Sequence, residues 1–591
     1  MDFRSVLAES VLFSRLSPQA LDVLAGKVGY HEISSGDVLF KHGEPSQRLY
    51  TVASGRMRAM LPNGTIAGDI GRGESIGEIG LLAGEPHGAT VYAVRDSELL
   101  SVKREDLADL VQQFPAALLE ATRVVIRRLR QNQASRKLES SRNNRAFALI
   151  PATRDVDVRP VALALAEALR VYGSTRLLDP TAVDDALGSG AAQTQFSGNG
   201  GRNAELITWL NDLESVHRYL VYTSNSPSDA WSRRCMRQAD RVLVVADATS
   251  PAADSPTVDA LKAYGTRAHV EMLMLRRDTG PAGDVLGWRE SIGARTHYFL
   301  RPGSKDDIAS LARQITGRGI GLVLGGGGAR GFAHIGMLRA LAELKIPIDS
   351  VGGTSMGAFF GALIACGYDP AQITEIARET YVKKNFLNDY LFPTVALIRG
   401  RKFVRRLHEI FQDRQIEQLR TPFFCVSTNL TRGTAMVHDR GPLHLWLATS
   451  MAVPGVAPPV GYRGELLADG AVVNSLPTDI MQSLERGPII ASDVSTEGDL
   501  RAPGVEGPDP EALFHWGTVG KRPGLMSIIF RTATLTSESG VAARAARADL
   551  YVRMPVSGVG LFDWNTLDEV SERGYRYALE KLSAVKSDLV K

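Results

Sequence analysis

Hydrophobic and polar positions alternate in short segments between about residues 36 and 102. The segments GDVLF, RLYTVAS, GRMRAMLP and SELLSVK are separated by turn-forming Gly, Pro and Asn residues. A period of two residues, broken by turn signals, is typical of antiparallel strands. We therefore predict a small antiparallel β domain with flanking helices over residues 1–140.

A helical pattern follows at about residues 104–138, with an interruption at Pro115, and ends at the polar sequence SSRNN. Residues 123–145 carry eight basic side chains, opposed only by Glu139. Such a run could contact anionic lipid. The run could instead belong to a solvated connector, or to a helix through which two copies of the chain form a homodimer. We favour this connector or dimer helix over a lipid contact.

Continuous apolar runs replace the alternating pattern in residues 145–315. The runs AFALIP, YLVYT and RVLVVAD are typical of buried parallel strands, and helical stretches such as VALALAEALRVYG lie between them. The first predicted strand is followed by ATRDVDVR, which lacks the Gly-rich loop and the G-K-[ST] of a phosphate-binding P-loop. We interpret this α/β domain as a spacer or regulatory domain without catalytic chemistry.

Strands and helices alternate again in residues 316–591. The predicted strands include GLVLG, DSVGGT, FFCVST, PIIASDV and ADLYVRM. This pattern predicts a third domain, with an open or mixed α/β sheet.

Composition narrows the class of protein. With 591 residues the chain is too long for one hydrophobic core, and a formal net charge of +3 argues against a dedicated nucleic-acid binder. Three widely spaced cysteines suit a reducing compartment and lack metal-ligand spacing. The start of the chain lacks a signal-peptide pattern, and no run of about 18 apolar residues occurs. We expect a cytoplasmic protein, or one peripheral to the inner face of the membrane, without metal or cofactor.

The pattern G-x-S-x-G occurs twice, as GTSMG around Ser355 and as GESIG around Ser75. The first copy follows the predicted strand DSVGGT and precedes the helix MGAFFGALIACG, which is the strand-serine-helix order of a nucleophile elbow. Gly353 and Gly357 would allow the sharp turn. The second copy lies among β-turn signals, so we interpret its serine as a turn residue.

A second glycine-rich segment, GGGGARG, follows the strand GLVL, and its residues 326–331 fit G-x-G-x-x-G. A dinucleotide site would need an acidic residue at the end of the second strand, but Asp349 lies at the opposite end. We prefer a loop whose backbone N–H groups form an oxyanion hole above Ser355. Arg330 would then lie near a charged head group or the transition state.

A nucleophilic serine needs a base, and Asp469 at the end of the predicted strand ELLAD is well placed to supply it. A Ser-Asp-His triad in hydrolase order would need a histidine downstream, and His515 is the only one. The residues alone leave two possibilities, a Ser-Asp dyad and a triad.

The combination of GGGGARG, GTSMG, AVPGVAPPV and DGA resembles the patatin-like phospholipases, in particular the bacterial branch similar to neuropathy target esterase. The resemblance implies a patatin-like α/β hydrolase domain, a Ser-Asp dyad and phospholipid or lysophospholipid substrates, with His334 and His515 structural. The middle domain, through WSRRCMRQADRVLVVAD, resembles the degenerate P-loop-like module of that branch. The implied roles are nucleophile Ser355, base Asp469, oxyanion loop Gly326, Gly327 and Gly328, and substrate or loop support Arg330, Gly331, Gly353, Gly357 and Gly470.

The segment GESIGEIGLLAGEPHGATVYAV resembles the phosphate-binding cassette of cyclic-nucleotide-binding domains, which implies a β-roll. Glu78 matches the acidic residue that meets the ribose. His87 and Gly88 stand where the family has an Arg-Ser pair, so a fixed guanidinium fork and a hydroxyl are missing. We expect this domain to bind cyclic nucleotides weakly or not at all.

The main hypothesis is therefore a serine esterase that acts on phospholipid or lysophospholipid at a membrane surface. One alternative is a non-catalytic regulatory or scaffold protein with a decayed sensor and a decayed P-loop-like domain. Another is a nucleotide-dependent enzyme that uses GGGGARG, which the position of Asp349 disfavours.

Overall fold

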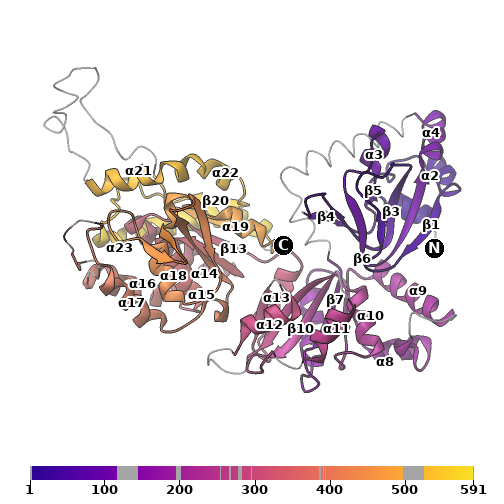
Figure 1. Ribbon diagram of the computed structural model, residues 1–591, viewed down its shortest axis with the longest axis horizontal. Helices are drawn as coiled ribbons and strands as arrows, with labels where there is room; N and C mark the ends of the chain where they lie inside the picture. The colour runs from indigo at the N-terminus through magenta and orange to yellow at the C-terminus, as the bar shows by residue number, and fades with distance from the viewer. Residues whose placement is uncertain are drawn as a thin grey trace. The chain divides into compact units, whose positions relative to one another are not determined.

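The computed structural model divides into two compact units, residues 1–316 and 317–591, which are described separately (Figure 1). It describes the chain from Phe3 to Leu589. The residues outside the description are 1–2, 65, 116–143, 195–200, 253–254, 265–267, 277–282, 295, 385, 387, 391, 393–394, 497–524 and 590–591.

The first unit begins with a β-roll. Its strands pair antiparallel in the order β1-β6-β3-β4, and β2 and β5 add to β6 and β3. Two long strands of 13 and 14 residues dominate, and most of their residues are buried. The elements are α1 (Phe3–Glu9), α2 (Pro18–Ala25), β1 (Gly29–Ile33), β2 (Val38–Phe40), β3 (Arg48–Met60), β4 (Ile66–Ile70), β5 (Ser75–Ile76), α3 (Glu78–Ala83), β6 (Thr90–Lys103) and α4 (Arg104–Gln113).

The first unit continues with a parallel six-stranded sheet of order β12-β11-β10-β7-β9-β8. In β7, residues 146, 148 and 150 face one buried cluster and residues 147 and 149 face another, so the strand is apolar throughout because both faces are covered. The elements are β7 (Ala146–Pro151), α7 (Arg159–Arg170), β8 (Thr175–Leu178), α8 (Pro180–Leu187), α9 (Gly201–Val216), β9 (Tyr219–Thr223), α10 (Ala230–Gln238), β10 (Arg241–Asp247), α11 (Pro256–Tyr264), β11 (His269–Leu275), α12 (Val285–Ile292), β12 (His297–Leu300) and α13 (Lys305–Ile315).

The second unit is a mixed α/β domain built on a sheet of order β17-β18-β15-β14-β13-β19-β20, with β16 beside β15. Strands β14, β13, β19 and β20 run parallel to β15, whereas β16 and β18 run antiparallel to it. The elements are β13 (Gly321–Leu324), α14 (Ala333–Glu343), β14 (Ser350–Thr354), α15 (Met356–Ala365), α16 (Pro370–Ala377), α17 (Arg401–Phe411), β15 (Phe423–Asn429), β16 (Thr434–His438), α18 (Leu443–Ser450), β17 (Val460–Tyr462), β18 (Glu465–Asp469), α19 (Thr478–Ser483), β19 (Ile489–Asp493), α21 (Leu525–Ser539), α22 (Val541–Ala545), β20 (Leu550–Arg553) and α23 (Leu567–Leu589).

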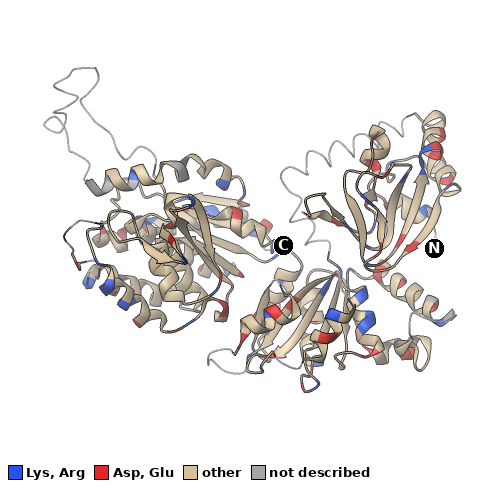
Figure 2. Cartoon of the chain, viewed as in Figure 1, with Lys and Arg blue, Asp and Glu red and all other residues tan. Residues whose placement is uncertain are grey.

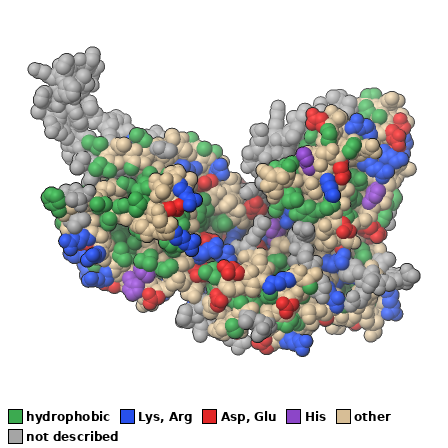
Figure 3. Space-filling view, in the orientation of Figure 1, with side chains coloured by type: hydrophobic (Ala, Val, Ile, Leu, Met, Phe, Trp, Pro, Cys, Tyr) green, Lys and Arg blue, Asp and Glu red, His purple; other side chains and the backbone are tan. Residues whose placement is uncertain are grey.

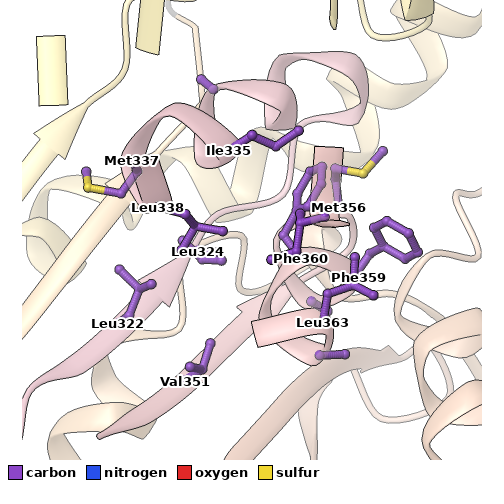
Figure 4. Close-up of a cluster of buried hydrophobic side chains, with 14 of the residues drawn as sticks. Leu322, Leu324, Ile335, Met337, Leu338, Val351, Met356, Phe359, Phe360 and Leu363 are labelled. Carbon is purple, nitrogen blue, oxygen red and sulfur yellow. The ribbon is translucent and has the colours of Figure 1, made fainter. Parts of the chain in front are cut away.

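A large buried cluster fixes α14 and α15 on this sheet (Figure 4). Leu322 and Leu324 belong to this cluster, and Val323 between them belongs to the cluster on the other face. Full burial of one such side chain contributes about 1.5–3 kcal/mol. The side chains drawn around the two helices include Leu322, Leu324, Ile335, Leu338, Val351, Met356, Phe359, Phe360 and Leu363. This packing makes the turn between β14 and α15 rigid.

The three-part α/β and β-roll architecture confirms the predicted fold class. The predicted helix at residues 104–138 begins as α4, but its basic run and the proposed dimer contact lie almost entirely outside the described residues. The boundary between residues 1–140 and 145–315 therefore stays a prediction. Among the described residues, every helix is too short or too polar to cross a bilayer.

Candidate active site

Ser355 occupies a strained turn between β14 and α15. Its backbone has φ 54° and ψ −121°, in the left-handed half of conformational space that side chains other than glycine rarely adopt. A Cβ at Gly353 would lie 2.6 Å from the backbone of Gly357, and a Cβ at Gly357 would lie 2.1 Å from the carbonyl oxygen of Leu324. The two glycines are therefore required by close backbone approach, as an elbow needs.

Asp469 reaches Ser355 through the register of three neighbouring strands. Thr354, the residue before the serine, pairs with Val426 of β15, and Asp469 at the end of β18 pairs with Ser427 on the other side of that strand. The two residues therefore lie at the same level across β15. The Oγ of Ser355 donates a hydrogen bond of 2.6 Å to Oδ2 of Asp469. The sequence-predicted pair is thus in direct contact.

Burial changes the acidity of this carboxyl group. Asp469 is fully buried, and burial raises its pKa from the usual 3.8 to about 6, although hydrogen bonds from Ser355 and from the backbone of Ala471 act in the opposite direction. The Ala471 N–H donates to Oδ1 at 2.8 Å. A carboxylate with a pKa near neutrality is a better proton acceptor than an ordinary aspartate and is still ionised at pH 7.

Ser450, at the end of α18, supports the strained turn and was not singled out in the sequence. Its Oγ accepts a 3.0 Å hydrogen bond from the N–H of Ser355 and donates a 2.6 Å hydrogen bond to the carbonyl of Val426. Both bonds are buried. The only signal in the sequence was that Ser450 immediately precedes the stretch MAVPGVAPPV, and a pattern cannot show a contact across 95 positions.

The glycine-rich loop after β13 lies next to the serine. A Cβ at Gly326 would lie 3.3 Å from Cβ of Ser355, but the N–H of this glycine donates to the carbonyl of Ser475 at 3.0 Å. Among the described residues, no acceptor meets the backbone N–H groups of Gly327, Gly328 or Met356, the residue after Ser355. These N–H groups remain available to a reacting oxygen.

Neighbouring residues hold this loop in place. The Nε of Arg330 donates to the carbonyl of Val559 at 2.7 Å, so this arginine also braces the C-terminal part of the domain. A Cβ at Gly331 would meet the side chain of Met356 at 2.3 Å. His334 lies between the carbonyl of Gly325 and the hydroxyl of Ser492, both at 2.9 Å. Burial lowers the pKa of His334 to about 4, which fits the structural role that we predicted.

Gly470 follows the aspartate and packs against the elbow. A Cβ on it would lie 2.2 Å from the carbonyl oxygen of Val426 and 2.8 Å from the methyl group of Thr354. The predicted glycine at this position is thus needed for close approach. His515, the histidine of the alternative triad, lies outside the described residues.

Ser355 opens into a cavity of about 620 Å³, which is the size of a site for a small organic ligand. Most of its lining is apolar, from Met356, Ile398, Met451 and other residues, whereas Arg399, Arg401, Arg405, His408 and His444 contribute basic groups. The arrangement can hold an apolar chain near the serine. The sequence of α17, RKFVRRLHEIF, carried a signal for this part of the site that we did not use. Its apolar residues recur at helical spacing among basic residues.

The positions of Asp349 and Ser75 in the fold test two further expectations from the sequence. Asp349 precedes β14, and its Oδ2 accepts the N–H of Ile320 at 2.9 Å, at the strand end opposite the glycine-rich loop. Ser75 lies in strand β5, paired with Thr51 of β3, and not in the turn that we predicted. The turn signals around it come instead from Gly73 and Gly77, whose φ values are +80° and +81°.

Two of the three residues predicted to bind a ligand in the β-roll, Glu78 and His87, are buried. Glu78 is buried in the first turn of α3. The ring of His87 stacks on Phe40, with centroids 3.5 Å apart and planes 8° apart, and burial lowers the pKa of His87. Around Gly88, an added Cβ would meet nothing within 4 Å. The position that holds arginine in the resembled family thus holds an uncharged ring packed on an aromatic one.

Three protein families match successive parts of the chain. Residues 30–114 match the cyclic nucleotide-binding domain, residues 143–301 match the neuropathy target esterase family P-loop like domain, and residues 322–481 match the patatin-like phospholipases.

Known proteins match over most of the chain. It is 30% identical to patatin-like phospholipase domain-containing protein 7 of Rattus norvegicus, over 92% of this chain and 45% of that protein. It is 30% identical to lysophospholipase NTE1 of Mycosarcoma maydis, over 97% of this chain and 34% of that protein. An uncharacterized NTE family protein of Mycobacterium tuberculosis is 29% identical, over 100% of this chain and 98% of that protein. The chain thus spans less than half the length of the first two relatives. These matches confirm the resemblance that the motifs predicted.

Proposed function

Because the chain belongs to the neuropathy target esterase branch of the patatin-like phospholipases, we propose that it is a serine esterase that hydrolyses carboxylic ester bonds of phospholipids or lysophospholipids. The observation that carries the proposal is the 2.6 Å contact between Ser355 and Asp469 at an apolar cavity. A scaffold protein would not need a strained serine, a buried base and unpaired N–H groups at one point.

In the first half of the proposed reaction, the Oγ of Ser355 attacks the carbonyl carbon of the ester while Asp469 accepts the hydroxyl proton. The negative charge that develops on the carbonyl oxygen is stabilised by backbone N–H groups. We assign this role to Gly327, Gly328 and Met356, since the N–H of Gly326 is already bonded. The tetrahedral intermediate collapses, the alcohol leaves with the proton from Asp469, and an acyl-serine remains.

In the second half, water attacks the acyl-serine while Asp469 again accepts a proton. Collapse returns that proton to Ser355 and releases the fatty acid, so the enzyme ends as it began. The pKa of Asp469, raised to about 6 by burial, suits a group that gives and takes a proton near neutral pH.

The cavity supports a lipid as substrate. Its apolar lining near Met451 and Val456 suits an acyl chain, and the basic groups of Arg399 and Arg401 suit the phosphate of a head group. One relative is named a lysophospholipase, which agrees with this substrate class.

A lipid panel tests the proposal directly. Purified full-length chain is incubated with lysophosphatidylcholine, diacyl phosphatidylcholine and their glycerol and ethanolamine counterparts, and released fatty acid is measured. We expect release from at least one of them and covalent labelling of Ser355 by a fluorophosphonate. A folded chain that neither releases fatty acid nor labels at Ser355 would contradict the proposal and favour the scaffold alternative.

A further inference from the structure

An anchored segment of chain lies beside the cavity. Tyr390 forms an antiparallel bridge with Ile398, and the N–H of Arg399 donates to the carbonyl of Asp389 at 2.9 Å. The carboxylate of Asp389 also accepts the N–H groups of Gly400 and Lys402, both at 3.2 Å, and so caps the start of α17. Both ends of this segment are therefore tied to the framework.

The same segment forms part of the cavity wall. The N–H groups of Leu397 and Ile398 donate to the carbonyls of Gly455 and Val456, each at 3.0 Å. Ile398 and Val456 both line the cavity that contains Ser355. The segment therefore continues into the wall of the site at Ile398.

Three large apolar side chains of this segment are exposed. The exposed fraction is 72% for Tyr390, 82% for Phe392 and 63% for Val395, and that of Phe392 is the highest of any large apolar side chain that the structure describes. Scattered single apolar residues on a surface are ordinary. Three within six positions, on a segment that continues into the cavity wall, are more than scattered single residues, and such a concentration is typical of an interaction surface. We call these three residues the apolar rim.

Positive charge borders the apolar rim. The charge comes from Arg401 and Arg405, which lie on the exposed face of α17 at helical spacing, and from Arg399, which precedes the helix. Figure 2 shows the concentration of Lys and Arg on this helix, and Figure 3 shows it at the lower left of the view, next to histidines and apolar side chains.

The acidic residues close to this face already have partners: the carboxylate of Asp389 accepts the N–H groups of Gly400 and Lys402. Glu409 contacts Arg406 at 3.3 Å, and Asp413 contacts His408 at 3.1 Å. Within the part of the chain that the structure describes, Arg399, Arg401 and Arg405 have no ion-pair partner, so their charge remains available to an external anion.

We propose that the apolar rim and the basic face of α17 dock this domain on an anionic lipid bilayer, so that the cavity opens onto the membrane. Aromatic and aliphatic side chains enter the boundary between head groups and acyl chains, and arginines contact anionic head groups. The entry of an acyl chain from the bilayer rests on the proposed function, whereas the docking itself does not. A bilayer fits better than a protein partner because the same segment and the same basic face adjoin a cavity of about 620 Å³ with a mostly apolar lining.

Vesicle binding by full-length chain tests the docking. The chain carries Ser355→Ala so that no lipid is consumed, and vesicles are either phosphatidylcholine alone or equal parts phosphatidylcholine and phosphatidylglycerol. We expect binding mainly to the anionic vesicles, weakened by salt. Replacing Arg401 and Arg405 with Gln should weaken that binding about 30-fold, since each arginine at an anionic surface contributes about fivefold. Phe392→Ser should weaken it about 10-fold.

Matched variants in the first unit control for general effects. Val395→Ser should weaken binding, whereas Val171→Ser, at a valine with an exposed fraction of 79%, should leave it unchanged. Arg159→Gln with Arg170→Gln removes the same net charge as the α17 pair and should have a much smaller effect. Absence of binding to anionic vesicles, or equal losses in the matched variants, would overturn the proposal. Equal binding to neutral and anionic vesicles would also overturn it.

Activity on a short, water-soluble ester separates this proposal from the proposed function. With Ser355 intact, Phe392→Ser and Val395→Ser should hydrolyse the soluble ester as the parent does and lose activity on anionic vesicles. Vesicle binding without any esterase activity would refute the proposed function and leave the docking surface supported. Full activity on vesicles in both variants would refute the docking surface alone.

Discussion

In GTSMG the serine has the positive φ value and the glycines are needed for close backbone approach, whereas in GESIG the two glycines have the positive φ values and the serine lies in a strand. The same five-residue pattern therefore satisfies two different physical needs. At Ser355 the strain, of order 1–3 kcal/mol, is maintained by packing on both sides of the elbow. At Ser75 the backbone is ordinary, and glycines turn the chain around it.

The largest expected difference between the two segments is in catalysis. Ser355→Ala should lower kcat/KM for a soluble ester by several orders of magnitude, because the covalent nucleophile is lost. Ser75→Ala should leave it nearly unchanged. Initial rates and thermal melting of both variants check this. Comparable losses in two folded variants would show that the elbow does not distinguish the serines.

The catalytic base, Asp469, should account for the next largest effect on kcat/KM. If Asp469 acts as an ionised base, kcat/KM should rise with pH to a plateau with a midpoint near 6, the pKa raised by burial. Asp469→Asn should lower activity by about 1,000-fold or more, because the remaining amide cannot accept the proton. A pH-rate profile measures both.

His515→Ala provides the control for the alternative triad. It should keep most of the parent's activity if the dyad suffices. A loss as large as that of Asp469→Asn, in a folded His515→Ala variant, would instead support the triad.

Support of the strained turn should have a smaller effect. Ser450→Ala removes the acceptor for the buried N–H of Ser355. Leaving such a group unpaired costs about 1–3 kcal/mol. We therefore expect kcat to fall roughly 5- to 150-fold, with KM little changed. Ser450→Thr, which keeps the hydroxyl, should restore much of it. The adjacent Thr449 donates only to the helix carbonyl of Leu445, and Thr449→Ala should matter little. A rise in KM alone would contradict this positioning role.

The natural β-roll should show the weakest response of all, which is little or no binding of cyclic nucleotides. Calorimetry on the full chain should detect little binding of cyclic AMP or GMP, because burial keeps His87 uncharged at neutral pH. His87→Arg with Gly88→Ser should raise affinity about 10- to 150-fold per restored charge-assisted hydrogen bond, and the open space around Gly88 admits the serine. Gly88→Ser alone should gain less. Tight binding by the natural sequence would contradict the interpretation.

The sequence was most informative where local pattern and burial coincide. Strands such as AFALIP and RVLVVAD are covered on both faces, so their apolar runs could be identified without knowledge of their neighbours. The proximity of Ser355 and Asp469 followed from the order of motifs in a known family. Local glycine spacing correctly indicated where the backbone of the elbow must approach itself.

Features that depend on distant contacts could not be read in this way. The hydrogen bond from the N–H of Ser355 to Ser450 joins two positions in different motifs, and the bond that occupies the N–H of Gly326 comes from Ser475. The basic face of α17 was visible as a pattern, but only the fold brings it to the cavity. The proposed dimer contact and the role of His515 stay predictions.

The buried carboxyl of Asp469 links catalysis to folding. Its pKa is about 6 in the native state and near 3.8 when unfolded, so the native state holds more protons between these values and stability falls as pH rises through them. Two pKa units correspond to about 3 kcal/mol, a sizeable part of the net stability of a typical domain. The contribution of this carboxyl group to the stability of the hydrolase domain is therefore largest at acidic pH, where the base is neutral and inactive. Part of that stability is lost at the pH where Asp469 can accept a proton. The free energy of unfolding therefore limits how deeply this carboxyl group can be buried.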